Sequence, residues 1–257
     1  MLRHSLIACA ILLSAISAQA ADAQGSQILE QVIAAAGGRD AYKHAGNFRA
    51  TGTFSLYSSG EVVESGSADL VGAGLKRFRL TASLGNETRV WLWNDGVGFL
   101  SAGNKQTGRI GSHNLSSLEG ITLPILKVVA LLDGHSSSIQ LVEVATVDGR
   151  EAYRIRVIQT PTDQKERLIL GRDSATTNIL IDKQTLSIIA IEDTIYPNGH
   201  LRESYQHGVE YRDYRAINGA QVPFSIKERI SGQATWGLQL NSFSPGESPS
   251  SSEFQLN

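Results

Sequence analysis

The clearest pattern along the chain is a series of apolar-rich stretches between residues 177 and 243, separated by very short polar connections. Asn218-Gly219 is typical of a two-residue type I′ hairpin turn, and residues 182–185 join two isoleucine-rich stretches in the same way. Connections this short leave no room for a crossover helix, so neighbouring strands must be antiparallel. The predicted strands of this meander are residues 178–182, 186–196, 201–217, 220–230 and 234–243.

Glycine, asparagine and aspartate pairs divide the rest of the chain in the same manner and predict further strands. Residues 103–117 are polar and glycine-rich, so a loop is expected there. About a dozen strands are more than an open twisted sheet carries without curling. We therefore predict a mainly β fold, in which a single curved antiparallel sheet of about 11–12 strands forms an incomplete barrel. The remaining predicted strands are residues 47–57, 61–71, 75–83, 87–93, 97–101, 139–147, 151–160 and 165–172.

Two segments have the spacing of helices rather than strands. Ser26 is expected to cap an amphipathic helix that ends at Gly37-Gly38, followed by a short helical turn over residues 40–44. The residues on the apolar face of the first helix are Ile28, Leu29, Val32, Ile33 and Ala36.

Residues 118–132 form a different kind of segment. Pro124 suits the first turn of a helix, and the following residues are apolar on nearly every side, with Lys127 as the only charge. Periodicity leaves two explanations open: a buried core helix that plugs the sheet, or a lid whose second face is covered by an apolar ligand. Under the lid hypothesis, the residues that line the ligand are Ile125, Leu126, Val129 and Leu132.

Trp91 and Trp93 lie two residues apart on a predicted strand and therefore share one face, with Arg89 beside them. Two indoles on one face either line a ligand cavity or fill an ordinary core.

The N-terminus has the order of an export signal. Arg3 precedes an apolar run over residues 6–16, and Ala18-Gln19-Ala20 matches a signal-peptidase site, so residues 1–20 are expected to be removed. Residues 21–257 are then one domain, with no segment near the roughly 20 apolar residues of a transmembrane helix. The one cysteine, Cys9, lies in the signal, which excludes disulfides and cysteine-ligated metals from the mature chain.

Composition and motifs exclude several functions. The mature chain carries 22 basic and 25 acidic residues, a net charge of −3 without a basic run, so no nucleic-acid partner is expected. Hydrolase elbows, phosphate loops and dinucleotide motifs are absent from the sequence. His200, Glu203 and His207 are the densest metal-like set, but an odd spacing on a strand separates the two imidazoles, which favours solvent-facing side chains. Glu192-Asp193 are adjacent and face apart, so they cannot pair as acid and base. No enzyme, metal or cofactor is predicted.

Several motifs resemble the periplasmic lipoprotein-carrier superfamily of the LolA and LolB type, including its outer-membrane lipoprotein-sorting proteins. They are Ala36-Gly37-Gly38, residues 48–53, residues 64–70, Trp93-Asn94-Asp95-Gly96, residues 211–215, Asn218-Gly219 and Val222-Pro223-Phe224. The resemblance implies an incomplete β-barrel on a helical lid, with a cavity for acyl chains and no cofactor or covalent chemistry. It also implies that residues 118–132 are the lid and that Trp91, Trp93 and Phe99 belong to the cup. Gly72-Ala73-Gly74 stands where the carrier has its gating arginine and proline, so the known gating mechanism is not implied.

The resulting hypothesis is a non-catalytic periplasmic carrier or chaperone for a lipid or lipoprotein acyl chain, with lipoprotein sorting to the outer membrane as one context. Donor and acceptor proteins in the inner or outer membrane would then be its partners. The alternative is an envelope scaffold or interaction protein with the same fold and a filled core. A void inside the cup distinguishes the two.

Overall fold

A computed structural model describes residues 22–103, 105–110, 118–119, 121–133, 137–160, 176–196 and 202–255. The predicted signal, residues 1–20, lies outside these ranges. One antiparallel sheet contains thirteen strands. They are β1 (Asn47–Ser58), β2 (Glu61–Ala73), β3 (Arg77–Leu84), β4 (Glu87–Asn94), β5 (Val97–Ala102), β6 (Lys105–Ile110), β7 (Ser137–Val147), β8 (Arg150–Gln159), β9 (Thr176–Asp182), β10 (Ile188–Ile195), β11 (Tyr205–Ile217), β12 (Ala220–Ile230) and β13 (Gln233–Pro245).

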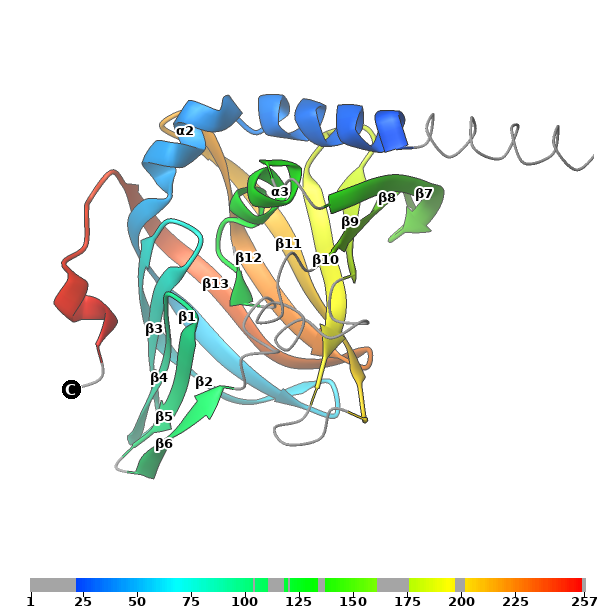
Figure 1. Cartoon of the computed structure of the whole chain (residues 1–257). Helices are drawn as coiled ribbons and strands as arrows, with labels where there is room; N and C mark the ends of the chain where they lie inside the picture. Colours follow the sequence, from blue (N-terminus) through cyan, green and yellow to red (C-terminus); the bar gives the residue numbers. More distant parts are fainter. Residues whose placement is uncertain are drawn as a thin grey trace, which may run out of the picture.

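The sheet consists of two meanders, and the first strand of one is joined to the last strand of the other in the middle of the sheet. Its order is β6-β5-β4-β3-β2-β1-β13-β12-β11-β10-β9-β8-β7, so β1 pairs with β13 while β6 and β7 lie at the two ends. The sheet curves around its helices without closing into a barrel (Figure 1). The predicted single curved antiparallel sheet is confirmed, with thirteen strands rather than 11–12.

Most predicted strands agree with the structure to within a few residues, and the hairpin chemistry explains why. Asn218 and Gly219 have φ angles of 49° and 87°, as a type I′ turn requires. Asp182 Oδ1 accepts the backbone N–H groups of Gln184 and Thr185 at 2.9 and 2.8 Å, which closes the β9–β10 connection. Two differences stand out. The segment expected to be a loop contains β6, and the predicted strand 165–172 lies outside the described residues.

The first helix covers residues 22–35 and lies across one end of the sheet (Figure 1). Its start differs from the prediction: Ser26 is inside the helix, where its hydroxyl donates to the Asp22 carbonyl at 3.0 Å instead of capping the N-terminus. The apolar face was predicted correctly, since Leu29 and Val32 are buried. Gly37, with φ of 114°, ends the helix so close to Gly219 that a Cβ atom would stand 2.0 Å from the Gly219 carbonyl oxygen. Helix α2 (Gly38–Ala45) then leads into β1.

Helix α3 (Pro124–Asp133) lies beneath the first helix on the inner side of the sheet (Figure 1). It is shorter than the predicted segment 118–132, because it begins only at Pro124, whose ring suits a first turn. Its buried residues are Pro124, Ile125, Lys127, Val128 and Leu131. The charge on Lys127 is therefore on the covered face of the helix.

Apolar residues of the inner sheet face and the helices form one large core. Ile155 and Val157 of β8 contribute to it, while Arg154, next to Ile155, points outward, as the alternation predicted. A second, smaller cluster lies on the outer face, where Phe254 of the C-terminal segment packs near Ala73 and Leu92. No helix in the described part of the chain is long and apolar enough to cross a bilayer.

Candidate ligand-binding cavity

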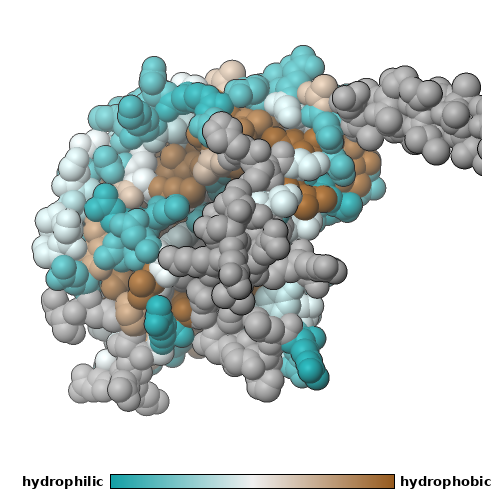
Figure 2. Space-filling view, viewed as in Figure 1, coloured by the Kyte–Doolittle hydropathy of each residue, from teal (hydrophilic) through white to brown (hydrophobic). Residues whose placement is uncertain are grey.

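An apolar cavity of about 200 Å³ lies on the inner face of the sheet, between the β1–β6 meander and strands β12 and β13. Figure 2 shows hydrophobic residues gathered on this inner side, below the polar surface of the first helices. All three tryptophans of the chain, Trp91, Trp93 and Trp236, line the cavity. The other lining residues are Phe54, Phe78, Leu80, Leu92, Leu100, Ile110, Leu118, Ile121, Thr122, Ile226, Glu228 and Leu238.

An aromatic group from three separate strands forms one wall of the cavity. Phe54 of β1 is fully buried, and its ring centroid lies 4.8 Å from that of Trp91 and 5.7 Å from that of Trp236. These separations are within the range in which aromatic pairs attract one another. The β1–β13 pairing brings the Trp236 strand beside the Phe54 strand, so the wall depends on the junction of the two meanders.

Three polar side chains interrupt the apolar lining. Trp93 Nε1 and Thr122 Oγ1 are buried and have no hydrogen-bond partner among the residues that the structure describes. Each side chain belongs to a residue that is only 2% exposed. Glu228 is the one ionisable residue among the lining residues, and its carboxylate accepts hydrogen bonds from His207 and Thr235.

Two of the predicted cup residues line the cavity and one does not. Trp91 and Trp93 share the inner face of β4, as their spacing predicted. Phe99 lies on β5 opposite Leu92, one residue out of step with the tryptophans, and packs in the outer cluster with Phe254. Leu92, between the two tryptophans, belongs to this cluster and also borders the cavity. The adjacent Leu100 pairs with Trp91 and borders the cavity instead.

The structure places the predicted lid residues away from this cavity. Ile125 borders a separate hollow of about 340 Å³ between the first helix, α3 and the β9–β10 turn. Leu126, Val129 and Leu132 are partly buried against the core and are not among the residues that line the apolar cavity. Leu118, Ile121 and Thr122, from the segment that precedes α3, line it in their place. The apolar character of positions 118 and 121 was the available signal in the sequence.

A cluster of buried charges adjoins the cavity. Asp193 of β10 and His207 of β11 are paired across the two strands, with Asp193 Oδ1 2.6 Å from His207 Nδ1. Glu228 Oε1 lies 3.1 Å from His207 Nε2, and Lys127 Nζ of α3 lies 3.4 Å from Asp193 Oδ2. The cluster thus connects α3 to three strands of the sheet. The sequence-based interpretation of His207 as solvent-facing is wrong, since the residue is 5% exposed. His200 lies outside the described residues.

The surroundings of His207 favour its charged form. Burial lowers the pKa of the imidazole, but the hydrogen bonds and charges of Asp193 and Glu228 outweigh burial and raise the pKa to about 9. Burial also raises the pKa of the Glu119 carboxyl, against the opposing charges of Lys127 and Lys76. Within the described ranges, no group of three histidine, cysteine or acidic residues is arranged to hold a metal ion. The contacts of the cluster make it an ion-pair network of Lys127, Asp193, His207 and Glu228.

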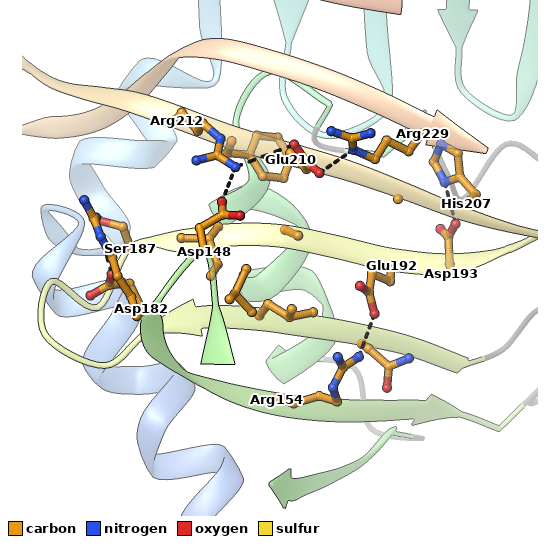
Figure 3. A pocket seen from close by; sticks show the side chains of 18 of the residues that line it. Asp148, Arg154, Asp182, Ser187, Glu192, Asp193, His207, Glu210, Arg212 and Arg229 are labelled. Atoms are coloured by element: carbon orange, nitrogen blue, oxygen red, sulfur yellow. Dashed lines mark hydrogen bonds and ion pairs between the residues drawn. The ribbon is translucent and has the colours of Figure 1, made fainter. Parts of the chain in front are cut away.

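A larger hollow, of about 1020 Å³, is a polar groove on the outer face of β8 to β12. Its charges pair with one another: Arg154 binds Glu192 at 2.7 Å, Arg229 binds Glu210 at 2.5 Å, and Arg212 binds Asp148 (Figure 3). Glu192 points into this groove while Asp193 points inward, so the two carboxylates face apart as predicted. Cross-strand pairing on a polar sheet face accounts for these contacts.

No protein-family model matches the sequence, and no curated protein matches it. Solved structures match over most of the chain. A domain of an outer membrane lipoprotein-sorting protein from Vibrio parahaemolyticus is 12% identical, with a TM-score of 0.55, and the match covers 91% of this chain and 97% of that one. A DUF1329 family protein from Desulfovibrio piger is 10% identical with the same TM-score and coverage. A LolA superfamily protein from Nitrosomonas europaea is 8% identical, with a TM-score of 0.53 and coverage of 88% and 96%.

At these identities the likeness concerns the fold alone. The resemblance expected from the sequence motifs is confirmed at that level: this chain has the fold of LolA superfamily and outer membrane lipoprotein-sorting domain structures.

Proposed function

We propose that the protein is a non-catalytic carrier or chaperone that holds a lipid or lipoprotein acyl chain in the apolar cavity. One observation carries the proposal: a void on the inner face of the sheet is lined almost wholly by apolar and aromatic side chains. Binding sites for small molecules are typically concave and mostly apolar, with a small number of polar groups. The scaffold alternative requires a filled core, and an unfilled cavity favours the carrier.

The volume limits what the cavity encloses. An engineered apolar cavity of about 150 Å³ in another protein binds benzene, so about 200 Å³ suits on the order of eight to ten non-hydrogen atoms. That is a short acyl chain or one end of a longer chain whose remainder lies outside the cavity.

Location and partners belong to the same proposal. Export to the periplasm follows from the signal-like order of residues 1–20, and transfer of a lipid would involve donor and acceptor proteins of the inner or outer membrane. Two of the matched structures are named for outer membrane lipoprotein sorting and for the LolA superfamily, which supports this setting by analogy. An intact mass of the periplasmic protein that still includes Met1 would contradict the export step.

The carrier proposal is tested by filling the cavity. Mass spectrometry of an organic extract identifies co-purified lipid, and tryptophan fluorescence follows uptake of an acyl probe, because every tryptophan lines the site. Leu238→Phe adds volume at the cavity wall and should weaken uptake at least tenfold with the fold intact. Val63→Phe, at an exposed position on β2, is the matched control and should bind as wild type. Absence of lipid and of probe uptake in the wild-type protein would favour the scaffold.

A further inference from the structure

The outer face of the sheet holds a peptide segment of the chain itself. After β13, residues 246–255, which we call the tail, run along the outer side of β3 (Figure 1). Most of the tail is exposed, but Phe254 is only 1% exposed. The apolar residues around its ring, on β2, β4 and β5, are Val71, Ala73, Val90, Leu92 and Phe99. A single buried aromatic anchor in an exposed segment is typical of the hot spots of protein interfaces.

The sheet also holds the tail by its backbone. Arg79 of β3 donates hydrogen bonds to the carbonyl oxygens of Glu253 and Gln255 at 3.2 and 3.0 Å. Asn94, at the end of β4, donates to the Phe254 carbonyl at 3.2 Å. Two side chains thus bind three successive carbonyl groups. Every peptide has such carbonyls, so these contacts suit any segment that adopts the same turn.

Two further arginines on this face add selectivity. Arg49 of β1 forms ion pairs with Glu247 and Glu253, each at 2.7 Å. The guanidinium carbon of Arg77 lies 5.6 Å from the centroid of the Phe254 ring, within the range of a cation–π contact. Arginines beside an apolar pocket suit a segment in which an acidic residue precedes an aromatic one.

The tail keeps its shape through local contacts. Ser250 and Glu253 form a capping box around the 3₁₀ turn η2 (Ser251–Phe254), and the Gln255 N–H donates to the Ser252 carbonyl at 3.2 Å. The preceding residues are rich in serine and proline, a composition typical of exposed linkers. The ion pairs with Arg49 are partly exposed, so they contribute little to stability. One anchor side chain therefore holds a segment that can detach while the sheet stays folded.

We propose that this outer site, formed by Arg49, Arg77, Arg79 and Asn94 around the apolar residues, binds a segment of a partner protein in which an acidic residue precedes an aromatic one. The tail is a ligand of the same chemistry on the same chain, and it occupies the site until the partner segment displaces it. The site lies on the opposite side of the sheet from the aromatic wall of the cavity, and the inference does not depend on the carrier function.

A synthetic peptide of residues 246–255, with blocked ends and a fluorescein label, tests the site by fluorescence polarisation. The full mature chain with Phe254→Ala lacks the anchor of its own tail and should bind the peptide. The wild type should bind it about tenfold more weakly, because a short linker holds its own tail at an effective concentration on the order of 1 mM, against a dissociation constant of about 100 μM for the free peptide. A peptide that itself carries Phe254→Ala should lose at least tenfold in affinity.

Substitutions in the protein locate the binding site. In the Phe254→Ala chain, Arg79→Gln should weaken peptide binding at least fivefold, because it removes the donor to two carbonyl groups. Arg212→Gln, at an exposed position on the outer face of β11, is the matched control and should bind the peptide as its parent does. Thermal melts show whether each variant is folded.

Three results would overturn the proposal. The first is a folded Phe254→Ala chain that does not bind the peptide, and the second is equal binding of the peptide with and without its phenylalanine. The third is a wild-type dimer that Phe254→Ala converts to a monomer, which would mean that a second copy of this chain is the occupant.

Hydrogen exchange of the wild type decides the matter if Phe254→Ala does not fold. The Gln255 amide of the tail should exchange at least tenfold faster than the paired amides of β3 and β4, because the tail detaches locally. Exchange of the tail only together with the whole sheet would show that it is a fixed part of the fold, and the proposal would fail.

Discussion

Raising the pH from 6 to 9.5 should destabilise the folded protein by about 3 kcal/mol through His207 alone. The pKa of this imidazole is 6.5 in its unperturbed state and about 9 in the fold. One pKa unit corresponds to about 1.4 kcal/mol, which gives about 3 kcal/mol for the complete effect. His207 is buried, so solvent screening reduces this value little.

The sign follows from the direction of the pKa change. A raised pKa means that the folded state holds the proton more tightly than the unfolded chain, so the stabilisation is complete below pH 6.5. It declines as the pH rises through the folded pKa near 9. The charged groups around the imidazole are Asp193 and Glu228, with Lys127 and Glu119 next to them. When His207 loses its proton, the buried carboxylates of Asp193 and Glu228 lose the positive charge that lies between them.

Urea unfolding at several pH values between 6 and 9.5 measures the effect. The free energy of unfolding of the wild type should fall about 3 kcal/mol further over this range than that of His207→Gln, which cannot titrate. His44→Gln, at an exposed position on α2, is the control for the histidine-to-glutamine exchange itself. Parallel curves for wild type and His207→Gln, or an imidazole NMR titration of His207 with a midpoint near 6.5, would refute the reasoning.

Two further predictions concern the contacts that hold the helices on the sheet. Lys127→Met should lower the free energy of unfolding by about 2 to 4 kcal/mol, because it removes a cation from a buried ion pair, whereas Lys43→Met on the exposed side of α2 should change it by about 0.5 kcal/mol or less in a denaturant titration. A cost for Lys127→Met no larger than that control's would show that the pair does not stabilise the fold. Gly37→Ala should destabilise the protein more than Gly60→Ala in thermal melts. Both positions have a positive φ angle, but only at Gly37 would the new Cβ meet the Gly219 backbone, while the space around Gly60 is open. Similar melting temperatures for the two variants would show that the end of the first helix does not pack tightly on the β11–β12 turn.

Local patterns in the sequence were sufficient to predict the elements of the sheet. The alternation around Ile155, the Asn218-Gly219 turn and the apolar face of the first helix each depend on residues close together in the chain, where backbone geometry fixes which side chains share a face. The number of strands then implied that the sheet curls. The errors in these elements are also local: Ser26 lies inside its helix because the helix starts earlier, and β6 occupies part of a segment whose glycines suggested a loop.

The cavity and the charged cluster depended on contacts that no local pattern contains. Phe54 and Trp236 meet because β1 pairs with β13. The pairing of these two strands depends on how the complete chain covers its apolar surface, and no single segment of the sequence determines it. Phe99 was assigned to the correct strand but to the wrong face, since the register between β4 and β5 placed it opposite Leu92.

The spacing of His200 and His207 in the sequence gives no information about Asp193 and Glu228. These two residues contact the His207 imidazole from neighbouring strands. The sequence by itself therefore determined the secondary structure, the single curved sheet and the presence of an apolar helix against it. The position of the void and the burial of a charged histidine were decided only by the tertiary structure, because both depend on long-range strand pairing and on the shapes of side chains that meet across it.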